Sequence, residues 1–245
     1  MKTCLAVDAS CLEYANAYSL QKRLVAARQA SLIPDVLLLC EHPHVITLGR
    51  NGKRVHLLAS ENLLHEMGVD FFTTDRGGDI TYHGPGQIVG YPVLQLAEMR
   101  RDLVWYVRQL EEAMIRSSVE LGIDAGRLPG KTGVWVPAEG PAREKLAAIG
   151  VHVSRWVTSH GFAYNVSTEL RYFDLIVPCG IADHKTTSLE RLLGRVVKRE
   201  EVVETITRNF GDVFGRTMRD VSPEELAAML EQAERLAALP APASA

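Results

Sequence analysis

The sequence lacks the features that mark a membrane protein, a secreted protein or a nucleic-acid-binding protein. No apolar run approaches the ~20 residues that a helix needs to span a bilayer. The formal net charge of −3 offers no excess of Lys and Arg for non-specific contacts with phosphate. Near the start, Asp8 and Glu13 interrupt what would be the apolar region of a signal peptide. We therefore expect no membrane, no nucleic acid and no secretion.

Cysteine is scarce, and its spacing excludes the common metal and redox motifs. The four cysteines, Cys4, Cys11, Cys40 and Cys179, contain no CxxC pair. The segment Glu41-His42-Pro43-His44 has no second Cys/His cluster at zinc-site spacing, so we expect no metal. Free thiols in a reducing cytoplasm fit this pattern.

The composition is that of a globular protein with a sizeable core. Of 245 residues, 47% are hydrophobic and 23% are charged, which excludes disorder as the main state. No internal repeat is visible. We expect one main domain over residues 1–221, a helical appendage over 222–237 and a flexible tail over 238–245. The appendage would begin at Ser222-Pro223-Glu224-Glu225, which has the capping-box form with Pro at the first helical position.

Short apolar runs alternate with helical patterns, which predicts a mixed sheet with helices. Helices are expected over 11–30 and 102–121 and through most of the last third, with a second capping box at Thr187-x-x-Glu190. Strands are expected at 5–10, 36–40, 45–49, 68–72, 80–83, 89–96, 133–136, 146–156, 161–166 and 173–178.

Two segments contain several glycines. Arg76–Gln87, RGGDITYHGPGQ, holds four, and glycine lets a ligand approach the backbone closely. A pair of structural turns explains the same pattern equally well. The segment 125–132, AGRLPGKT, resembles a phosphate-binding loop, which needs a strand before it and a helix after it. Here a helix precedes and a strand-like run follows, so we interpret it as a helix-to-strand turn.

Cys179 and Lys145 are the main candidates for chemistry. Cys179 stands between Pro178 and Gly180 after an apolar strand candidate, and a constrained turn is where a scaffold displays reactive groups. Lys145 opens the apolar run 146–153. On its own it is interpreted as a solvated strand-end lysine, although desolvation would lower the pKa of its ammonium.

Four segments in order, RGGDITYHGPGQ, KLAAIG, HGFAYNV and PCGI, resemble those of the lipoyl(octanoyl) transferase family. These enzymes are octanoyl-[acyl carrier protein]:protein N-octanoyltransferases, and the resemblance runs from about Leu5 to Arg216. It implies an α+β (mixed α/β) fold like the catalytic domain of biotin and lipoate protein ligases, with a mixed, partly antiparallel central sheet flanked by helices. Residues 1–221 would then be the catalytic domain.

The resemblance also implies the reaction. Cys179 would take an octanoyl group from octanoyl-acyl carrier protein as a thioester, and Lys145 would be its acid/base partner, without a cofactor. The acceptors would be lipoyl domains of 2-oxoacid dehydrogenase complexes and the glycine cleavage H protein. The acyl site would be lined by Arg76, Gly77, Gly78, Asp79, Ile80, Thr81, Tyr82, His83, Ala148, Ile149, Gly150, Gly161, Phe162 and Ala163.

The same chemistry also follows from the general properties of thiols and amines, without the family resemblance. A free thiol has a pKa of ~8.5, and a nearby ammonium stabilises the thiolate. A neutral Lys145 can accept the proton of an incoming lysine amine. Because conversion of a thioester to an amide is downhill, no ATP is needed. Carrier proteins are usually acidic, so a cationic rim is expected for docking, with Arg50, Arg54 and Arg76 as candidates.

Three alternatives remain open. The nearest is an ATP-dependent lipoate or biotin protein ligase, which activates the acid as an adenylate and needs no cysteine. The second is a Cys–His hydrolase with His83 or His160 as base, although His160, like His152, is otherwise interpreted as a core or edge histidine. The third is a non-catalytic binder of acyl carrier protein.

Overall fold

The computed structural model describes residues 1–138, 142–177 and 185–239, and two sheets organise this part of the chain. The main sheet has the strand order β11-β1-β2-β6-β10-β9-β8-β7. β1 runs parallel to β2 and β11, and the other neighbours are antiparallel, so the predicted mixed sheet is confirmed. Its strands are β1 (Lys2–Cys11), β2 (Asp35–Glu41), β6 (Gln87–Val93), β7 (Gly126–Leu128), β8 (Lys131–Pro137), β9 (Arg143–Ser154), β10 (Val157–Asn165) and β11 (Arg216–Asp220).

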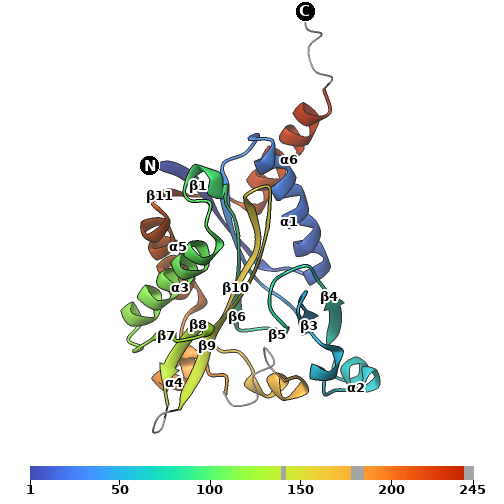
Figure 1. Cartoon of the computed structure of the whole chain (residues 1–245), viewed down its shortest axis with the longest axis vertical. Helices are drawn as coiled ribbons and strands as arrows, with labels where there is room; N and C mark the ends of the chain where they lie inside the picture. The colour runs from blue at the N-terminus through green and yellow to red at the C-terminus, as the bar shows by residue number, and fades with distance from the viewer. Residues whose placement is uncertain (139–141, 178–184, 240–245) are drawn as a thin grey trace, which may run out of the picture.

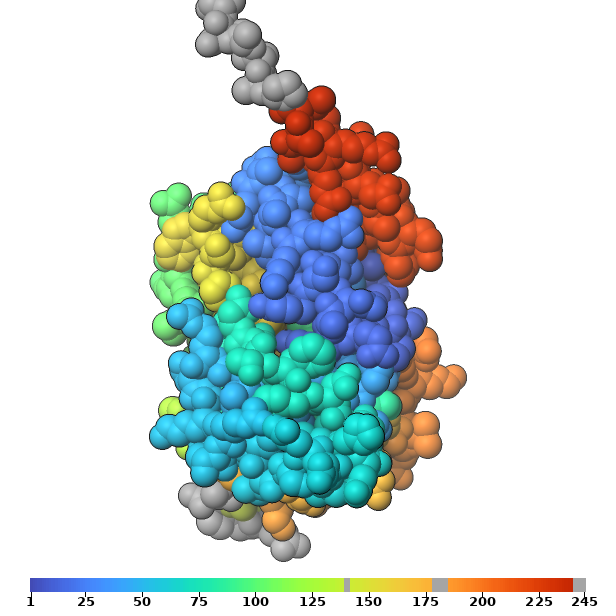
Figure 2. Space-filling model, turned by 90° about the vertical axis from the view of Figure 1, so that its right-hand side faces the viewer, coloured from blue at the N-terminus to red at the C-terminus, as the bar shows by residue number. Residues whose placement is uncertain are grey.

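A smaller sheet of order β4-β3-β5 lies beside one end of the main sheet (Figure 1). Its strands are β3 (Val45–Leu48), β4 (Asp70–Thr73) and β5 (Ile80–His83). It has its own apolar cluster, in which Ile80 and Tyr82 pack against Phe173 and Ile176. In the space-filling view, the light-blue to turquoise residues of this region cover the lower half of the face shown (Figure 2).

Helices cover both faces of the main sheet (Figure 1). α3 and α5 pack on one face, where Leu110 and Met114 meet Phe210 and Tyr164 in the larger apolar cluster. α1 and α6 pack on the other face, together with Val36 of β2. The helices are α1 (Tyr14–Gln29), α2 (Glu61–Glu66), α3 (Leu103–Glu120), α4 (Leu189–Leu193), α5 (Arg199–Phe214) and α6 (Pro223–Ala237), with 3-10 turns η1 (Arg54–His56), η2 (Leu96–Glu98) and η3 (Leu170–Leu175).

The predicted helix boundaries follow from local capping. Asp102 caps α3 by accepting a hydrogen bond from the backbone N–H of Trp105 at 2.9 Å. Ser222 does the same for α6 through the N–H of Glu225 at 3.1 Å, so the predicted N-cap at Ser222 is confirmed. Along α6, Leu226, Leu230 and Ala233 are buried in the cluster that contains α1. In Figure 2, α6 lies against the blue N-terminal part of the chain.

Several local predictions were wrong. The run 173–178, expected as a strand, contains the end of η3, and Ile176 forms only an isolated bridge with Leu57. A short apolar run fits a buried helical turn as well as a strand, and here Tyr172 and Phe173 fill the small-sheet cluster. The remainder of that run, residue 178, lies outside the described residues.

Other errors concern ends of elements. The helix expected over 11–30 begins only at Tyr14, because Cys11 is the last residue of β1. The expected strand 146–156 ends at Ser154, because Arg155 and Trp156 have positive φ and form the two-residue turn of a hairpin with β10. Thr187 does not cap α4. That helix begins at Leu189 after Ser188, which makes no side-chain capping bond.

Among the described residues, no helix combines the length and apolar character needed to cross a membrane. Nor do these residues contain a group of three or more His, Cys, Asp or Glu side chains placed to hold a metal ion.

A buried ionic cluster joins β2 to α1, near the start of the chain, and to β11, near its end. The carboxylate of Asp35, 2% exposed, accepts hydrogen bonds from Arg28 Nε at 2.8 Å and from Arg216 Nε at 2.9 Å. The backbone N–H of Gln95 adds a third bond at 3.0 Å. Glu98 accepts from the second arm of Arg28 at 2.6 Å. One carboxylate in β2 thus connects α1, β11 and the entry to η2.

We predict that Asp35→Ala strongly destabilises the protein. The substitution leaves two buried guanidinium groups facing a cavity, and breaking a buried ion pair costs about 3–5 kcal/mol. Chemical denaturation followed by circular dichroism measures the change in the free energy of unfolding. The matched control is Glu234→Ala, which removes the solvent-exposed pair with Arg23 and should hardly move the midpoint. Equal midpoint shifts in the two variants would contradict the assigned role of Asp35.

Candidate functional site

A cavity of about 310 Å³ lies between the main sheet and the segment that leads into β5. Its floor is a row of residues with little or no side chain. Ala148 and Gly150 of β9 pair with Ala163 and Gly161 of β10, and Ala163 pairs with Val89 of β6. Because alternate residues of a strand share a face, these side chains and Tyr91 point to the same side of the sheet. The row leaves open space where larger side chains would fill a core.

The segment 76–83 forms the roof of the cavity, and glycines let it approach the floor. The N–H of Gly77 donates to the carbonyl of Val151 at 2.9 Å. A Cβ on Gly150 would stand 2.7 Å from the carbonyl oxygen of Gly77, which real contacts do not allow. Gly78 has φ +86°, a conformation that side chains disfavour. The structure therefore gives both roof glycines a backbone role.

Arg76 anchors the start of this roof. Its guanidinium is buried and donates through Nη2 to the carbonyl and hydroxyl oxygens of Thr47, at 2.7 and 2.9 Å, and through Nη1 to the carbonyl of Gly77 at 3.1 Å. The expectation that Arg76 belongs to an exposed cationic rim is therefore wrong. Of the other two rim candidates, Arg50 is exposed, and Arg54 is exposed but pairs with Glu61.

A β-bulge turns Lys145 toward the cavity. Along β8 and β9 the pairing steps from Val134–Ala147 to Trp135–Lys145, so Leu146 is an extra residue on β9. Bulges re-aim side chains in this way and are frequent beside active sites. Leu146 is buried in the larger cluster, whereas Lys145 lines the cavity with its Nζ 4.7 Å from the centre of the Trp135 ring. Lys145 is 9% exposed, so it is not the solvated lysine of the simplest interpretation.

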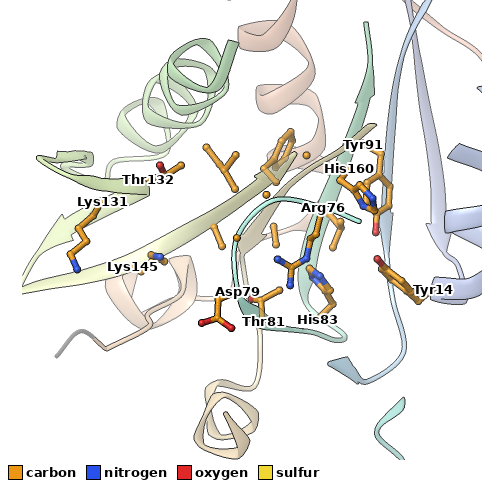
Figure 3. Close-up of a pocket in the computed structure, with 18 of the residues that line it drawn as sticks. Tyr14, Arg76, Asp79, Thr81, His83, Tyr91, Lys131, Thr132, Lys145 and His160 are labelled. Atoms are coloured by element: carbon orange, nitrogen blue, oxygen red, sulfur yellow. The ribbon is translucent and has the colours of Figure 1, made fainter. Parts of the chain in front are cut away.

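Aromatic and histidine side chains close the opposite end of the cavity (Figure 3). The Nδ1–H of His42 donates to the carbonyl of Leu12 at 2.5 Å, so its Nε2 accepts from the hydroxyl of Tyr91 at 2.7 Å. Tyr14 packs against both His42 and His83, with ring centres 5.5 and 6.2 Å apart. Burial lowers the pKa of His42 to about 4 and that of His83 to about 3, so both rings are neutral at neutral pH.

His160 lies at the same end of the cavity, and its hydrogen-bond partners lie outside the cavity lining. Its Nε2 lies 2.8 Å from a carboxylate oxygen of Asp75, which also accepts from the hydroxyl of Tyr18 at 2.9 Å. Its backbone has φ +53°, and its N–H donates to the side chain of Gln21 at 2.8 Å. Burial lowers the pKa of His160, although Asp75 opposes this change.

Most of the residues expected to line an acyl site line this one cavity: Arg76, Gly78, Asp79, Thr81, His83, Ala148, Ile149, Gly150, Gly161, Phe162 and Ala163. Gly77 does not line it. Ile80 and Tyr82 are buried in the small-sheet cluster, because they alternate along β5 with Thr81 and His83. Cys179 lies outside the described residues.

Sequence reasoning missed six lining residues, Tyr14, Val89, Tyr91, Gly130, Lys131 and Thr132, and considered His160 only as a hydrolase base or a core or edge histidine. Val89 and Tyr91 follow from strand alternation once β6 is known to neighbour β10. Residues 130–132 belong to the dismissed phosphate-loop look-alike, which is a hairpin turn between β7 and β8 rather than a helix-to-strand turn. No helix N-terminus follows it, so the phosphate-binding geometry is absent there.

Comparisons with known proteins give this arrangement a context. Residues 13–211 match the family model of the lipoyl protein ligase A/B catalytic domain. A protein named Octanoyltransferase from Solibacter usitatus is 51% identical over 214 residues, covering 87% of this chain and 94% of that protein. Its namesake from Caldicellulosiruptor bescii is 46% identical over 222 residues, covering 90% and 95%.

Solved structures agree on the fold. A bipartite lipoate protein ligase from Thermoplasma acidophilum superposes with a TM-score of 0.71 at 17% identity, covering 95% of this chain and 91% of that one. A lipoate-protein ligase A bound with ATP gives a TM-score of 0.67 at 16% identity, covering 95% and 94%. The predicted biotin/lipoate ligase-like fold is thereby confirmed.

We predict that the free energy of unfolding falls as the pH is lowered from 6.5 to 5. The folded-state pKa values of His42 and His83 lie below the unfolded value near ~6.5, so in this range only the unfolded state takes up their protons. Stability is thus present above pH 6.5 and is lost toward pH 4, by up to ~1.4 kcal/mol per pH unit for each histidine. Denaturant titrations at several pH values measure this slope.

His83→Asn should flatten the slope, whereas His65→Asn on the exposed side of α2 should leave it unchanged. A wild-type slope of zero between pH 6.5 and 5 would show that the buried histidines are charged in the folded protein.

Proposed function

The chain belongs to the lipoyl protein ligase A/B catalytic-domain family, and we propose that its octanoyl transfer in lipoate biosynthesis proceeds through a thioester on Cys179. The single observation that carries this function is the 51% identity over 87% of the chain with a relative named Octanoyltransferase. In this proposal the donor is octanoyl-acyl carrier protein. The acceptors are lysines of lipoyl domains in 2-oxoacid dehydrogenase complexes and of the glycine cleavage H protein.

Contacts of the residues that flank 178–184 support a role for Cys179 at the cavity. Val177 donates its N–H to the carbonyl of His56 at 2.8 Å, and His56 bonds the cavity residue Asp79 at 2.5 Å. On the other side, Lys145 donates its N–H to the carbonyl of Lys185 at 2.8 Å. Both flanks are therefore tied to the rim. Cys179 is two residues from Val177, and each residue spans at most ~3.6 Å.

In the first half-reaction the Cys179 thiolate attacks the thioester carbonyl of the donor. The bond to the carrier's thiol breaks, the departing thiolate takes a proton, and the octanoyl group remains on Cys179. The ammonium of Lys145 favours the attacking thiolate, and it is the proton source for the departing one. Backbone N–H groups near Gly180 or in the glycine-rich segment would stabilise the oxyanion.

In the second half-reaction Lys145, now neutral, accepts a proton from the lipoyl-domain lysine. The amine attacks the Cys179 thioester, and Lys145 takes the proton that the amine nitrogen loses as the amide forms. The Cys179 thiolate is released beside the regenerated Lys145 ammonium. The two steps need opposite protonation states of Lys145, which lines the cavity. No ATP enters, because a thioester already activates the acyl group.

The alternatives have less support. The ligase alternative shares the fold, so the fold does not separate the two, but an adenylate-forming ligase has no use for a nucleophilic cysteine. For a Cys–His hydrolase, His83 would be a poor base, because burial lowers its pKa to about 3. His160 lies at the other end of the cavity from Lys145 (Figure 3) and already bonds Asp75.

We predict that wild-type protein incubated with octanoyl-acyl carrier protein, without ATP, gains one octanoyl group in intact mass spectrometry. Cys179→Ser should gain none, because a serine hydroxyl is a much poorer nucleophile near neutral pH. Cys11→Ser is the matched control, since Cys11 is the exposed cysteine among the described residues and should not be needed. Octanoyl on Cys4, Cys11 or Cys40, or a strict need for ATP, would refute the proposal.

Two substitutions of Lys145 should separate its two roles. Lys145→Arg keeps a charge that supports the thiolate but does not release a proton at useful pH, so acylation should persist while transfer stalls. Lys145→Met should slow both steps by at least ~100-fold, the usual contribution of general acid–base catalysis. Iodoacetamide alkylation against pH and single-turnover transfer measure the two steps.

Lys198→Met, at the exposed start of α5, is the control and should behave as wild type. Normal alkylation profiles and normal transfer in Lys145→Met would remove Lys145 from the mechanism.

A further inference from the structure

We propose that Trp135 is a positioning residue that holds the ammonium of Lys145 at the cavity through the face of its indole ring. The inference rests on the proposed function, because Trp135 has a part in the reaction only if Lys145 has one. It deepens that function by naming a residue that acts through Lys145 rather than on the acyl group.

The strand register brings the two side chains together. Trp135 of β8 pairs with Lys145 of β9, and Lys145 Nζ lies over the indole ring, 4.7 Å from its centre. Directly paired residues of antiparallel strands are neighbours on the same face of a sheet. This pair exists because of the bulge. If the register of Val134 with Ala147 continued without an extra residue, Trp135 would pair with Leu146 instead.

Trp135 is buried, but on the cavity side of the sheet. Its neighbours Val134 and Val136 belong to the larger apolar cluster, whereas Trp135, at 2% exposed, is not a member of that cluster as the described residues form it. Successive residues of a strand point to opposite faces, so the ring lies on the face that also carries Lys145. The position of this large ring is therefore explained by what it adjoins at the site rather than by the core.

Other contacts restrict the backbone and the stem of Lys145. Its N–H donates to the carbonyl of Lys185 at 2.8 Å, and its carbonyl accepts from the N–H of Thr187 at 3.0 Å. A Cβ on Gly133 would stand 3.6 Å from Lys145 Cε, so the stem passes close to the Gly133 backbone. These contacts direct the side chain, and the ring of Trp135 adds a contact to its charged end.

The contact with the ring favours one charge state of Lys145. The face of an indole ring is negative and attracts a cation more strongly than other aromatic rings do, and the attraction grows where water is excluded. Lys145 is 9% exposed. A neutral amine gains no such attraction. In the proposed mechanism the ammonium acts in the first half-reaction and the neutral amine in the second, so loss of the ring should slow the first more than the second.

Proton–carbon NMR of protein labelled with ¹³C at the lysine ε-carbon tests the contact without any substrate. Ring currents move protons above an aromatic face upfield. The Lys145 signal, identified by its loss in Lys145→Met, should therefore lie upfield of the other lysine signals and return to their range in Trp135→Leu. A Lys145 signal at the ordinary lysine position in the wild type would overturn the proposal.

Kinetics test the consequence. In Trp135→Leu, acyl-enzyme formation from octanoyl-acyl carrier protein should fall ~10-fold in kcat/KM, while single-turnover transfer from the pre-acylated protein should stay within ~3-fold of wild type. Iodoacetamide alkylation of Cys179 should need a higher pH than in wild type, part of the way to the profile of Lys145→Met. Trp135→Phe keeps a ring face and should restore part of the loss.

Trp105→Leu is the matched control, because it makes the same substitution on α3, where Trp105 packs on Phe214 with ring centres 6.1 Å apart. It should leave alkylation and acylation unchanged. Thermal melting of all variants shows whether they are folded.

A second approach keeps the shape of the ring. In a Trp105→Phe, Trp156→Phe background, Trp135 is replaced biosynthetically by monofluoro- and difluorotryptophan. Fluorine withdraws electron density from the ring face while the size of the ring hardly changes, so acyl-enzyme formation should decline stepwise with the number of fluorines. This series decides the question if Trp135→Leu does not fold.

The outcomes separate the two proposals. If wild-type protein forms no acyl enzyme, or if Lys145→Met alkylates and transfers normally, the proposed mechanism fails and the role of Trp135 fails with it. If Lys145→Met is slow but Trp135→Leu and the fluorinated proteins behave as wild type, only the role of Trp135 is refuted. Equal slowing of both half-reactions in Trp135→Leu, or the same loss in Trp105→Leu, would show a general structural effect and would also refute it.

Discussion

The close approach of the roof to strand β9 is the constraint on which the cavity depends. Gly77 bonds Val151 across a gap that has no room for a Cβ on Gly150. If the roof stood farther out, the buried guanidinium of Arg76 would lose its bonds to Thr47, and a hydrogen bond from a charged group costs more to lose than an ordinary one. Backbone contact and charge burial thus hold the same short segment in place.

The site also depends on two separate hydrophobic cores. The larger cluster holds the far side of β9 through Leu146, and the small-sheet cluster holds the far side of β5 through Ile80 and Tyr82. Because the faces of β9 and β5 that point away from the cavity pack in these cores, the faces toward the cavity can carry small or polar residues without loss of the fold. The bulge at Leu146 reverses the alternation along β9, and it puts Lys145 on the inner face.

Features that depend on residues near each other in sequence were predictable, and features that depend on residues far apart were not. The strands and the glycine-rich roof follow from local patterns, and the ordered motifs fixed the fold family. The tyrosine end of the cavity did not, since Tyr14 of α1 and Tyr91 of β6 both reach His42 only through tertiary packing. The local context of residues 130–132 excludes a phosphate-binding loop, but it does not show that this turn lines the cavity. Arg76 was assigned to the surface because charge alone does not reveal that Thr47 offers it two buried acceptors.

The parallel pairing of β1 with β11 has a consequence for synthesis. Lys2 pairs with Arg216, so the first strand of the chain gains its outer neighbour only after more than two hundred residues have been made. Until then β1 presents an open edge, and Asp35 has one of its two arginine partners. Contacts so distant in sequence form slowly. A chain still on the ribosome therefore already contains the strands that line the cavity, in a sheet whose edge β11 has yet to cover.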